Sequence, residues 1–238
     1  MGHWYTKNGK AKHFITGKNG KERPTTLRDA RKLELLPSVT EILNVAAKPG
    51  LERWKINQAY LAALTLPKIE GESLDDFKIR AEADAKAQSE EAMNLGSDIH
   101  ADIERYYNGE KPINHGYIAQ RVAEEIAKYT GLEDNWVAER TFSSAYGYGG
   151  MIDLSQPGWI IDYKTKDFTD ASKQLAWDEH GMQLSAYAHG VGDPDARKLN
   201  VFVSTSTDLV VIHEWKDDYF PRFRCLLEYW KLTKNYNP

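Results

Sequence analysis

The stretch GYGGMIDLSQPGWIIDYKTK, residues 147–166, contains two apolar runs separated by a Pro-Gly pair. The first run ends at Asp153, and the second ends near Asp162, which Lys164 follows two residues later. Short apolar runs around Pro-Gly predict two neighbouring strands joined by a turn. The two carboxylates can then lie side by side at neighbouring strand ends. Because strand side chains alternate, Asp162 and Lys164 project from the same face of their strand.

The two aspartates indicate a cation site. Adjacent carboxylates repel each other unless they share a proton or a cation. Hard divalent cations take oxygen ligands, so Mg²⁺ or Mn²⁺ is the natural reason for pairing Asp153 with Asp162. The ammonium of Lys164 could orient or help to deprotonate an attacking water, or offset charge on a phosphorane-like transition state. Taken alone, an Asp-x-Lys triplet is more often a surface salt bridge.

Two helical segments supply further polar side chains. In GSDIHADIERYY, residues 96–107, His100 and Glu104 are four apart and share a helix face, while Ile99 and Ile103 form a neighbouring stripe that can face the core. In GMQLSAYAHG, residues 181–190, Gln183 and Tyr187 are also four apart and aim at one spot. Each pair alone is more often helix-surface decoration, but the ordered set of four motifs is much more specific.

The remaining pattern predicts one α+β domain over residues 1–238. Two Asn-Gly pairs favour a small β-meander over residues 1–35. A capping box of Ser38 and Glu41 starts a helix that Lys48-Pro49-Gly50 ends. We expect a helical part at 36–130 and an α/β core at 131–238, in which a central mixed sheet is flanked by helices. The predicted helices and strands are helices at 51–66, 74–107 with a break at 94–96, 117–129, 173–190 and 218–234, and strands at 135–142, 147–155, 159–165, 199–206 and 209–215.

Composition and charge bound the class of protein. The chain has 238 residues, 41% hydrophobic and 28% charged, which is ordinary for a soluble globular protein, and no apolar run approaches the roughly 20 residues of a membrane span. A single cysteine, Cys225, cannot form an intrachain disulfide and fits a reducing cytoplasm. The N-terminus lacks the apolar core of a signal peptide. We therefore expect a cytoplasmic protein without a membrane partner.

The net charge of −4 hides an asymmetry. Residues 1–35 carry nine Lys or Arg against three Asp or Glu, a balance of +6, so the remainder carries −10. The Asn-Gly tips are flanked by lysines that could contact a polyanion, and a solvated tail would look the same. The lysines concerned are Lys7, Lys10, Lys18 and Lys21.

The ordered motifs resemble the PD-(D/E)xK nuclease superfamily, in particular its RecB-like exonuclease branch. The matching stretches are LGSDIHADIE, VAERTF, GGMIDL, WIIDYKTK and MQLSAYA. The front segment LPSVTEIL…KPGLERWK also resembles phage-encoded exonucleases and the mitochondrial genome-maintenance exonuclease. The likeness runs from about Leu36 to Tyr187 and implies a restriction-endonuclease-like core.

The resemblance also implies roles for individual residues. His100, Asp153 and Asp162 would ligate the metal together with the backbone carbonyl of Tyr163, and Lys164 would be the catalytic lysine. Glu104 and Glu139 match acidic positions near the site, Gln183 and Tyr187 match the motif that follows it, and Thr165 fits the DYKT ending, at which we expect contact with DNA. The first-strand Pro-Asp of the superfamily is replaced here by MID. A neutral His100 ligand implies that activity falls at acidic pH, near the reference imidazole pKa of about 6.5.

The function implied is a Mg²⁺- or Mn²⁺-dependent deoxyribonuclease, an exonuclease that acts in phage or bacterial DNA recombination, repair or degradation. Its partner would be single-stranded DNA or duplex ends in the bacterial cytoplasm, and a single-strand-annealing or recombination protein is a further candidate. One cysteine cannot hold the iron–sulfur cluster of some relatives, and without a Walker A motif we expect no bound nucleotide. Two alternatives are a structure-selective or restriction-like endonuclease and a catalytically silent DNA-binding accessory protein.

Overall fold

The computed structural model describes residues 2–238 and divides into two compact units. One unit comprises the chain up to Ala46 together with Ile99–Pro238, and the second is Ala47–Asp98. The single domain predicted over residues 1–238 stays a prediction. Among the described helices, none is both long enough and apolar enough to cross a membrane.

A five-stranded mixed sheet lies at the centre of the first unit. Its order is β5-β6-β7-β8-β9, in which only β7 and β8 run parallel. The strands are β5 Val137–Ser144, β6 Tyr148–Gln156, β7 Trp159–Lys166, β8 Arg197–Ser204 and β9 Val210–Trp215. Tight turns join the antiparallel strands β5, β6 and β7, whereas the parallel pair needs a crossover, which α6 (Asp178–Gly190) supplies. The prediction of an α+β fold around a mixed sheet is confirmed.

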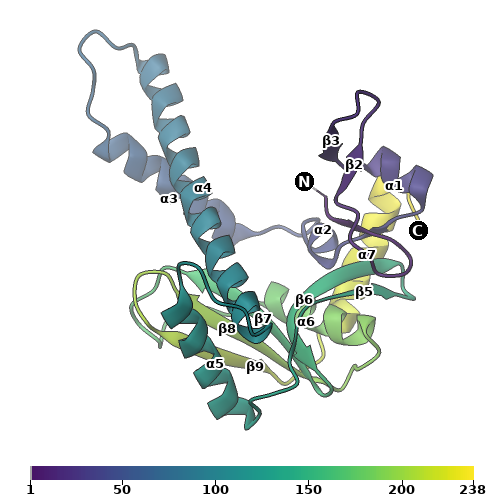
Figure 1. Ribbon diagram of the computed structural model, residues 1–238. Helices are drawn as coiled ribbons and strands as arrows, with labels where there is room; N and C mark the ends of the chain where they lie inside the picture. Colours follow the sequence, from purple (N-terminus) through teal and green to yellow (C-terminus); the bar gives the residue numbers. More distant parts are fainter. Residues whose placement is uncertain (1) are drawn as a thin grey trace. The chain divides into compact units, whose positions relative to one another are not determined.

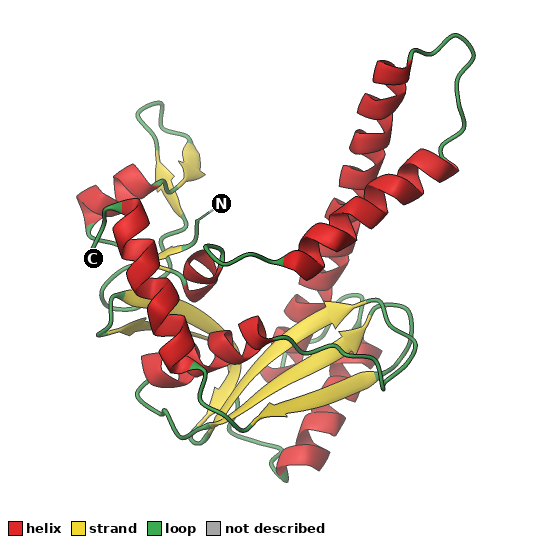
Figure 2. Ribbon diagram, turned by 180° about the vertical axis from the view of Figure 1, so that it is seen from behind, coloured by secondary structure: helices red, strands yellow, loops and turns green. Residues whose placement is uncertain are grey.

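Helices cover both faces of this sheet. Helix α6 and the C-terminal α7 (Phe220–Lys234) lie on one face, and α5 (Gly116–Thr130) lies on the other with the end of α4 (Figures 1 and 2). The core between α6, α7 and the sheet includes Trp230, Phe223 and Tyr148, all fully buried. Helix α6 approaches β5 so closely that a Cβ on Gly190 would lie 2.1 Å from a ring carbon of Phe142. Only glycine fits there, and the sheet-facing side of α6 is thereby fixed.

The end of α4 is anchored by a buried acid. Helix α4 spans Leu74–Tyr107, and Ile99 and Ile103 face the core as predicted. Asp102, 1% exposed, accepts hydrogen bonds from the backbone N–H groups of residues 113–115 and from Arg105. Burial opposes its ionisation, but these donors outweigh burial and lower the pKa of Asp102. The anchor fixes the helix turn that carries His100.

The N-terminal segment contains the predicted small β-structure and an unpredicted helix. Strand β1 (Trp4–Tyr5) pairs with β4 (Leu36–Pro37), and β2 (Phe14–Thr16) pairs with β3 (Glu22–Pro24), both antiparallel. Both Asn-Gly pairs form turns, with φ of 81° at Gly9 and 75° at Gly20. The meander does not continue to residue 35, because Thr26 and Asp29 form a capping box that starts α1 (Leu27–Leu33).

Several helix boundaries differ from the predicted ones, among them the start of α6, which begins at Asp178 and not at residue 173. Ser38 caps α2 (Val39–Leu43) as expected, its Oγ accepting from the Glu41 N–H at 3.0 Å, but the helix ends at Leu43. Pro49 begins α3 (Pro49–Thr65) instead of ending a helix. Proline is tolerated there because the N–H groups of a first helical turn have no hydrogen-bond partner within the helix. Helix α4 continues through 94–96, where the predicted break is wrong; Gly96 costs about 1 kcal/mol relative to alanine, which a long helix tolerates.

The second unit consists of α3, most of α4 and the loop between them. Arg80 of α4 bonds to Glu72 and to the carbonyl of Pro67, which ties the loop to the helix. The sequence predicts α3 as an amphipathic helix, yet Leu51 and Trp54 remain 43% and 40% exposed. Large apolar side chains are exposed throughout this unit: Leu51, Trp54, Ile56, Tyr60, Leu61, Leu64, Ile69, Leu74, Ile79 and Met93.

Candidate active site

The two aspartates lie where the pairing between β6 and β7 ends. The antiparallel register pairs Leu154 with Ile161, and its next step would place Asp153 opposite Asp162. Beyond the last paired step, the Tyr163 N–H donates to a side chain of the neighbouring strand, Asp153 Oδ2, at 2.8 Å. Both strands continue past their acid, so the expected position at strand ends is wrong. The predicted side-by-side arrangement across the two strands is confirmed.

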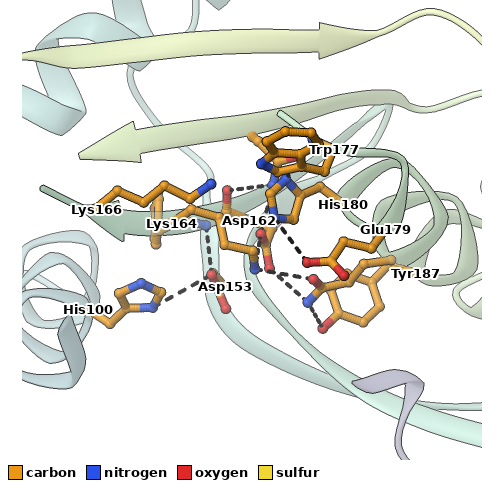
Figure 3. A network of polar contacts seen from close by, with 12 residues as sticks. His100, Asp153, Asp162, Lys164, Lys166, Trp177, Glu179, His180 and Tyr187 are labelled. Atoms are coloured by element: carbon orange, nitrogen blue, oxygen red, sulfur yellow. Dashed lines mark hydrogen bonds and ion pairs between the residues drawn. The ribbon is translucent and has the colours of Figure 1, made fainter. Parts of the chain in front are cut away.

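Asp162 is the centre of a hydrogen-bonded network (Figure 3). Its carboxylate is buried, with 2% of the residue exposed. Lys164 Nζ lies 2.5 Å from Oδ2, and Gln183 Nε2 donates to Oδ1 at 2.9 Å. Asn200 Nδ2 donates to Oδ2 at 2.8 Å. The D-x-K pair is therefore a partly buried ion pair within a polar network, not a surface salt bridge.

Gln183 on α6 links Lys164 to two acceptors, Asp162 on β7 and Tyr187 on α6. Its Oε1 accepts from Lys164 Nζ at 3.1 Å, and its Nε2 also donates to Tyr187 Oη at 2.8 Å. A lysine ammonium only donates, so the Gln183 amide must turn its oxygen to Lys164 and its nitrogen to Asp162. Burial raises the pKa of Tyr187 well above its usual range, so the hydroxyl stays neutral. Gln183 and Tyr187 are thus in contact with each other, and of the two predicted donors Gln183 is the one that meets Asp162.

His100 approaches the same place from α4. Its Nδ1 lies 3.7 Å from Asp153 Oδ2, and its ring packs edge-on against Tyr163 with centroids 5.7 Å apart. Burial lowers the pKa of His100 to about 4, although the nearby Asp162 carboxylate acts in the opposite direction. The imidazole is thus neutral at physiological pH, the form that binds metals. An acidic limb due to His100 should lie nearer pH 4 than the expected 6.5.

Three acids form a row across the sheet. The register between β5 and β6 pairs Ala138 with Leu154 and Arg140 with Ile152, so Glu139 and Asp153 fall at the step between these pairs, and the same count from β6 to β7 leads from Asp153 to Asp162. Burial raises the pKa of Asp153 well above its usual range, and the Asp162 carboxylate adds to this effect. Burial also raises the pKa of Glu139 to about 7, with Glu104 as the second cause. Glu139 has φ of 51°, a left-handed conformation that is uncommon outside glycine and that clusters at functional sites.

The raised pKa of Glu139 predicts a pH-dependent stability. The folded-state pKa of about 7 exceeds the ordinary value of 4.5, so the folded protein retains this proton longer than the unfolded chain. Stability therefore falls as pH rises from about 4.5 to 7. Glu139→Gln should match the wild type at pH 5 and be more stable at pH 8, by on the order of 1 kcal/mol.

Urea unfolding of both proteins at the two pH values, in EDTA, measures this difference. The exposed Glu133→Gln is the matched control and should show no pH-dependent gain. Equal stability of Glu139→Gln and wild type at pH 8 would show that the surroundings of Glu139 do not disfavour its ionised form.

Thr165 and the four turn lysines, predicted to contact DNA, lie on β7 and in the N-terminal turns. Thr165 is partly buried on β7, paired with Val203 of β8. The first lysine-flanked turn rests against β5, where Ser143 Oγ donates to the Lys7 carbonyl at 2.7 Å. Lys7 pairs with Glu34 at 2.8 Å. The four turn lysines, all exposed, are Lys7, Lys10, Lys18 and Lys21.

Asn200 on β8 and Trp215 on β9 contact the network around Asp162, and the sequence motifs did not predict them. Asn200 is completely buried, and Trp215 Nε1 donates to its Oδ1 at 2.7 Å. The signal was present in the sequence: Asn200 interrupts the apolar run LNVFV, as the two aspartates interrupt theirs. The partner strand of β8 could not be known from local sequence, so the contact with Asp162 was missed.

The donor set fits a hard divalent cation in its chemistry. It combines carboxylates of Asp153 and Asp162 with a neutral imidazole of His100. The burial and mutual repulsion that raise the pKa of Asp153 are also costs that a bound cation relieves. Among the described residues 2–238, no three His, Cys, Asp or Glu side chains are already gathered around one point, so His100, Asp153 and Asp162 would have to draw closer together around an ion. Backbone oxygen or water would complete its coordination sphere.

Comparisons with known proteins add little to this picture. No protein-family model and no curated protein matches the chain. Thirteen chains of solved structures match, among them one titled "Crystal structure of SSO0001". That structure is 17% identical, with 79% of this chain and 87% of that chain covered and a TM-score of 0.35. A likeness of this strength says nothing about function.

Proposed function

We propose that the protein is a Mg²⁺- or Mn²⁺-dependent DNA exonuclease of the PD-(D/E)xK type. One observation carries the proposal: four motifs, ordered helix, strand, strand and helix along the chain, meet in one network. His100 reaches Asp153, and Asp162 binds both Lys164 and Gln183. Buried acids with a lysine and a neutral imidazole are a costly arrangement, and phosphodiester hydrolysis is a chemistry that uses all of them.

The ligands for the ion would be His100, Asp153 and Asp162, with the backbone carbonyl of Tyr163. Bound there, a divalent ion supplies a water of lowered pKa and an electrophilic contact for a phosphate oxygen. The chain itself keeps His100 neutral and fixes the Asp153 carboxylate on the Tyr163 N–H. Asp153 is therefore oriented before any ligand arrives, which lowers the cost of binding.

Lys164 would act on the charge of the reacting phosphate. Gln183 Oε1 and Asp162 hold its ammonium within the network, at 3.1 Å and 2.5 Å. A fixed cation in a poorly hydrated site stabilises negative charge that develops on the phosphate oxygens far better than one in water. Gln183 in turn depends on Lys164 for its orientation, so the pair forms one unit.

Digestion of linear and circular DNA with Mg²⁺ separates the candidate functions. An exonuclease degrades linear duplex or single strands and leaves covalently closed circles intact. A structure-selective or restriction-like endonuclease, the second candidate within the same fold, also nicks or linearises circles. A silent DNA-binding protein shifts DNA in a gel without releasing nucleotides. Activity on linear DNA alone supports the proposal, and cutting of circles or complete inactivity contradicts it.

The basic turns would hold DNA near the site without reading its sequence. Two lysine-flanked tips project exposed ammonium groups, and contacts of this kind to phosphates release counterions. Replacing all four turn lysines by glutamine should raise the DNA concentration for half-maximal cleavage. The slope of log affinity for DNA against log salt concentration should become shallower by up to about 4. The rate at saturating DNA should hardly change, because no residue of the network is touched.

Cleavage rates across a series of DNA and salt concentrations test this expectation. The matched control makes the same change of charge at exposed lysines outside the basic segment, namely Lys86, Lys111, Lys128 and Lys216. An unchanged salt slope for the turn variant, or an equal change for the control, would assign the turn lysines to solubility alone.

A further inference from the structure

Asn200 is a buried amide in an apolar strand. It lies at the centre of β8, is 0% exposed, and stands beside Asp162 in the parallel register between β7 and β8. Its strand neighbours Leu199 and Val201 are also fully buried and apolar. Burying an amide costs free energy unless its donors and acceptor are satisfied, so an aliphatic residue would be the simpler choice for packing.

The indole of Trp215 fixes the orientation of this amide. Trp215 Nε1 lies 2.7 Å from Asn200 Oδ1. An indole N–H only donates, so Oδ1 must face Trp215 and Nδ2 must face the opposite way. Nδ2 then donates to Asp162 Oδ2 at 2.8 Å and lies 3.4 Å from the Asp162 carbonyl. Strand β9 therefore determines, through β8, which group meets the carboxylate on β7.

Asp162 is thus clamped by two amides, one on each oxygen. Gln183 donates to Oδ1 and Asn200 to Oδ2, and each amide is oriented by a partner that can only donate. Lys164 shares Oδ2 with Asn200. If Lys164 moves away from Oδ2, Asn200 still holds the carboxylate in its present rotamer, because Trp215 and not the lysine orients this amide. Asp162 Oδ2 can then exchange the ammonium of Lys164 for another cation without reorientation of the aspartate side chain.

The geometry points to Asn200, with Trp215 behind it, as a positioning residue that holds Asp162 ready to bind the divalent ion. This inference rests on the proposed function and adds to it a residue pair outside the motifs of the resemblance. Outer partners that orient metal-binding side chains typically change metal affinity or activity by about 10–100-fold when removed. The pair should accordingly govern metal affinity and the catalytic rate, and leave DNA binding unaffected.

Two substitutions test the pair, with a matched control. Asn200→Leu keeps the branching and the number of heavy atoms of the side chain and removes both hydrogen bonds. Trp215→Phe removes the indole N–H that orients the amide. Trp230→Phe is the control, because Trp230 is also buried and its Nε1 has no hydrogen-bond partner among residues 2–238. Mn²⁺ affinity of EDTA-treated, metal-free protein is measured by calorimetry, alongside kcat and KM for linear DNA and the midpoint of thermal unfolding.

The expected result is Mn²⁺ affinity about 10–100-fold weaker for Asn200→Leu, with a smaller loss in the same direction for Trp215→Phe. In both variants kcat falls, KM for DNA stays near the wild-type value, and high Mn²⁺ restores part of the rate. Trp230→Phe changes neither Mn²⁺ affinity nor kcat, whatever it does to unfolding. If Asn200→Leu fails to fold, Trp215→Phe against Trp230→Phe carries the test.

Two outcomes overturn the inference and are distinguishable. In the first, the wild-type protein binds Mn²⁺ and cleaves DNA, and folded Asn200→Leu and Trp215→Phe do both equally well. This result keeps the proposed function and removes the positioning role. Wild-type protein that neither binds Mn²⁺ nor cleaves DNA removes the proposed function and the positioning role together.

Discussion

Replacing Asp162 by Asn should reduce Mg²⁺-dependent DNA cleavage by at least about 10³-fold, and Asp153→Asn should do the same. Each change removes a carboxylate that would bind the ion and keeps the shape of the side chain. Asp162 lies within bonding distance of Lys164, Gln183 and Asn200, so its loss also unsettles the lysine. Nucleotide release from end-labelled linear DNA measures the effect, and the exposed Asp195→Asn should retain wild-type activity.

The two variants should differ in stability although both are inactive. Burial and the neighbouring Asp162 raise the pKa of Asp153, so its charge is a cost to the folded metal-free protein at neutral pH. Asp153→Asn removes that cost and should keep or raise the free energy of unfolding in EDTA. Asp162→Asn deprives Lys164 of its partner at 2.5 Å and should lower that free energy. Full Mg²⁺-dependent activity of Asp162→Asn would show that the site is assigned wrongly.

Lys164→Met should lower kcat by about 10²–10³-fold with little change in KM for DNA. The ammonium would be fixed where charge develops during the proposed phosphodiester cleavage, and methionine keeps the length of the side chain without the charge. Mn²⁺ affinity should stay level or increase, because Lys164 competes with the ion for Asp162 Oδ2. This combination separates a residue that acts on the reaction from one that binds metal.

Single-turnover cleavage and Mn²⁺ calorimetry on the same preparation measure both quantities. The exposed Lys216→Met is the control for loss of one positive charge and should match the wild type. Lys164→Met with unchanged kcat would reduce the lysine to a structural partner of Asp162.

Local sequence predicted the parts of the site that follow from spacing within one element. Asp162 and Lys164 share a strand face and Gln183 and Tyr187 share a helix face because strand and helix periods are fixed. The pairing of Asp153 with Asp162 was accessible because a short turn joins their strands. The apolar interruption at an acid marked both positions in the sequence.

Contacts between distant strands could not be predicted in the same way. Asn200 meets Asp162 only because β8 pairs in parallel with β7 after a crossover, and Trp215 meets Asn200 only because β9 returns beside β8. No local pattern contains that register. The strained backbone of Glu139 was equally hidden, since φ at one strand residue reflects its surroundings and not its type.

Errors in the helices came from signals with two meanings. Lys48-Pro49-Gly50 predicts the end of a helix, but proline at the first turn also starts a helix. Gly96 favours a break in a helix, but the tertiary anchor at Asp102 stabilises the end of this one. Thr26 and Asp29 carried a real capping box that was overlooked beside the stronger Asn-Gly turns.

The central claim is that the network around Asp162 hydrolyses DNA with a divalent ion. Its most direct test is nucleotide release from end-labelled linear DNA by the wild-type protein, first in EDTA and then after Mg²⁺ is restored in excess. The expected result is no release in EDTA and progressive release from the ends with Mg²⁺, absent in a parallel preparation of Asp162→Asn. Release that persists in EDTA, or equal release by Asp162→Asn, would contradict the claim.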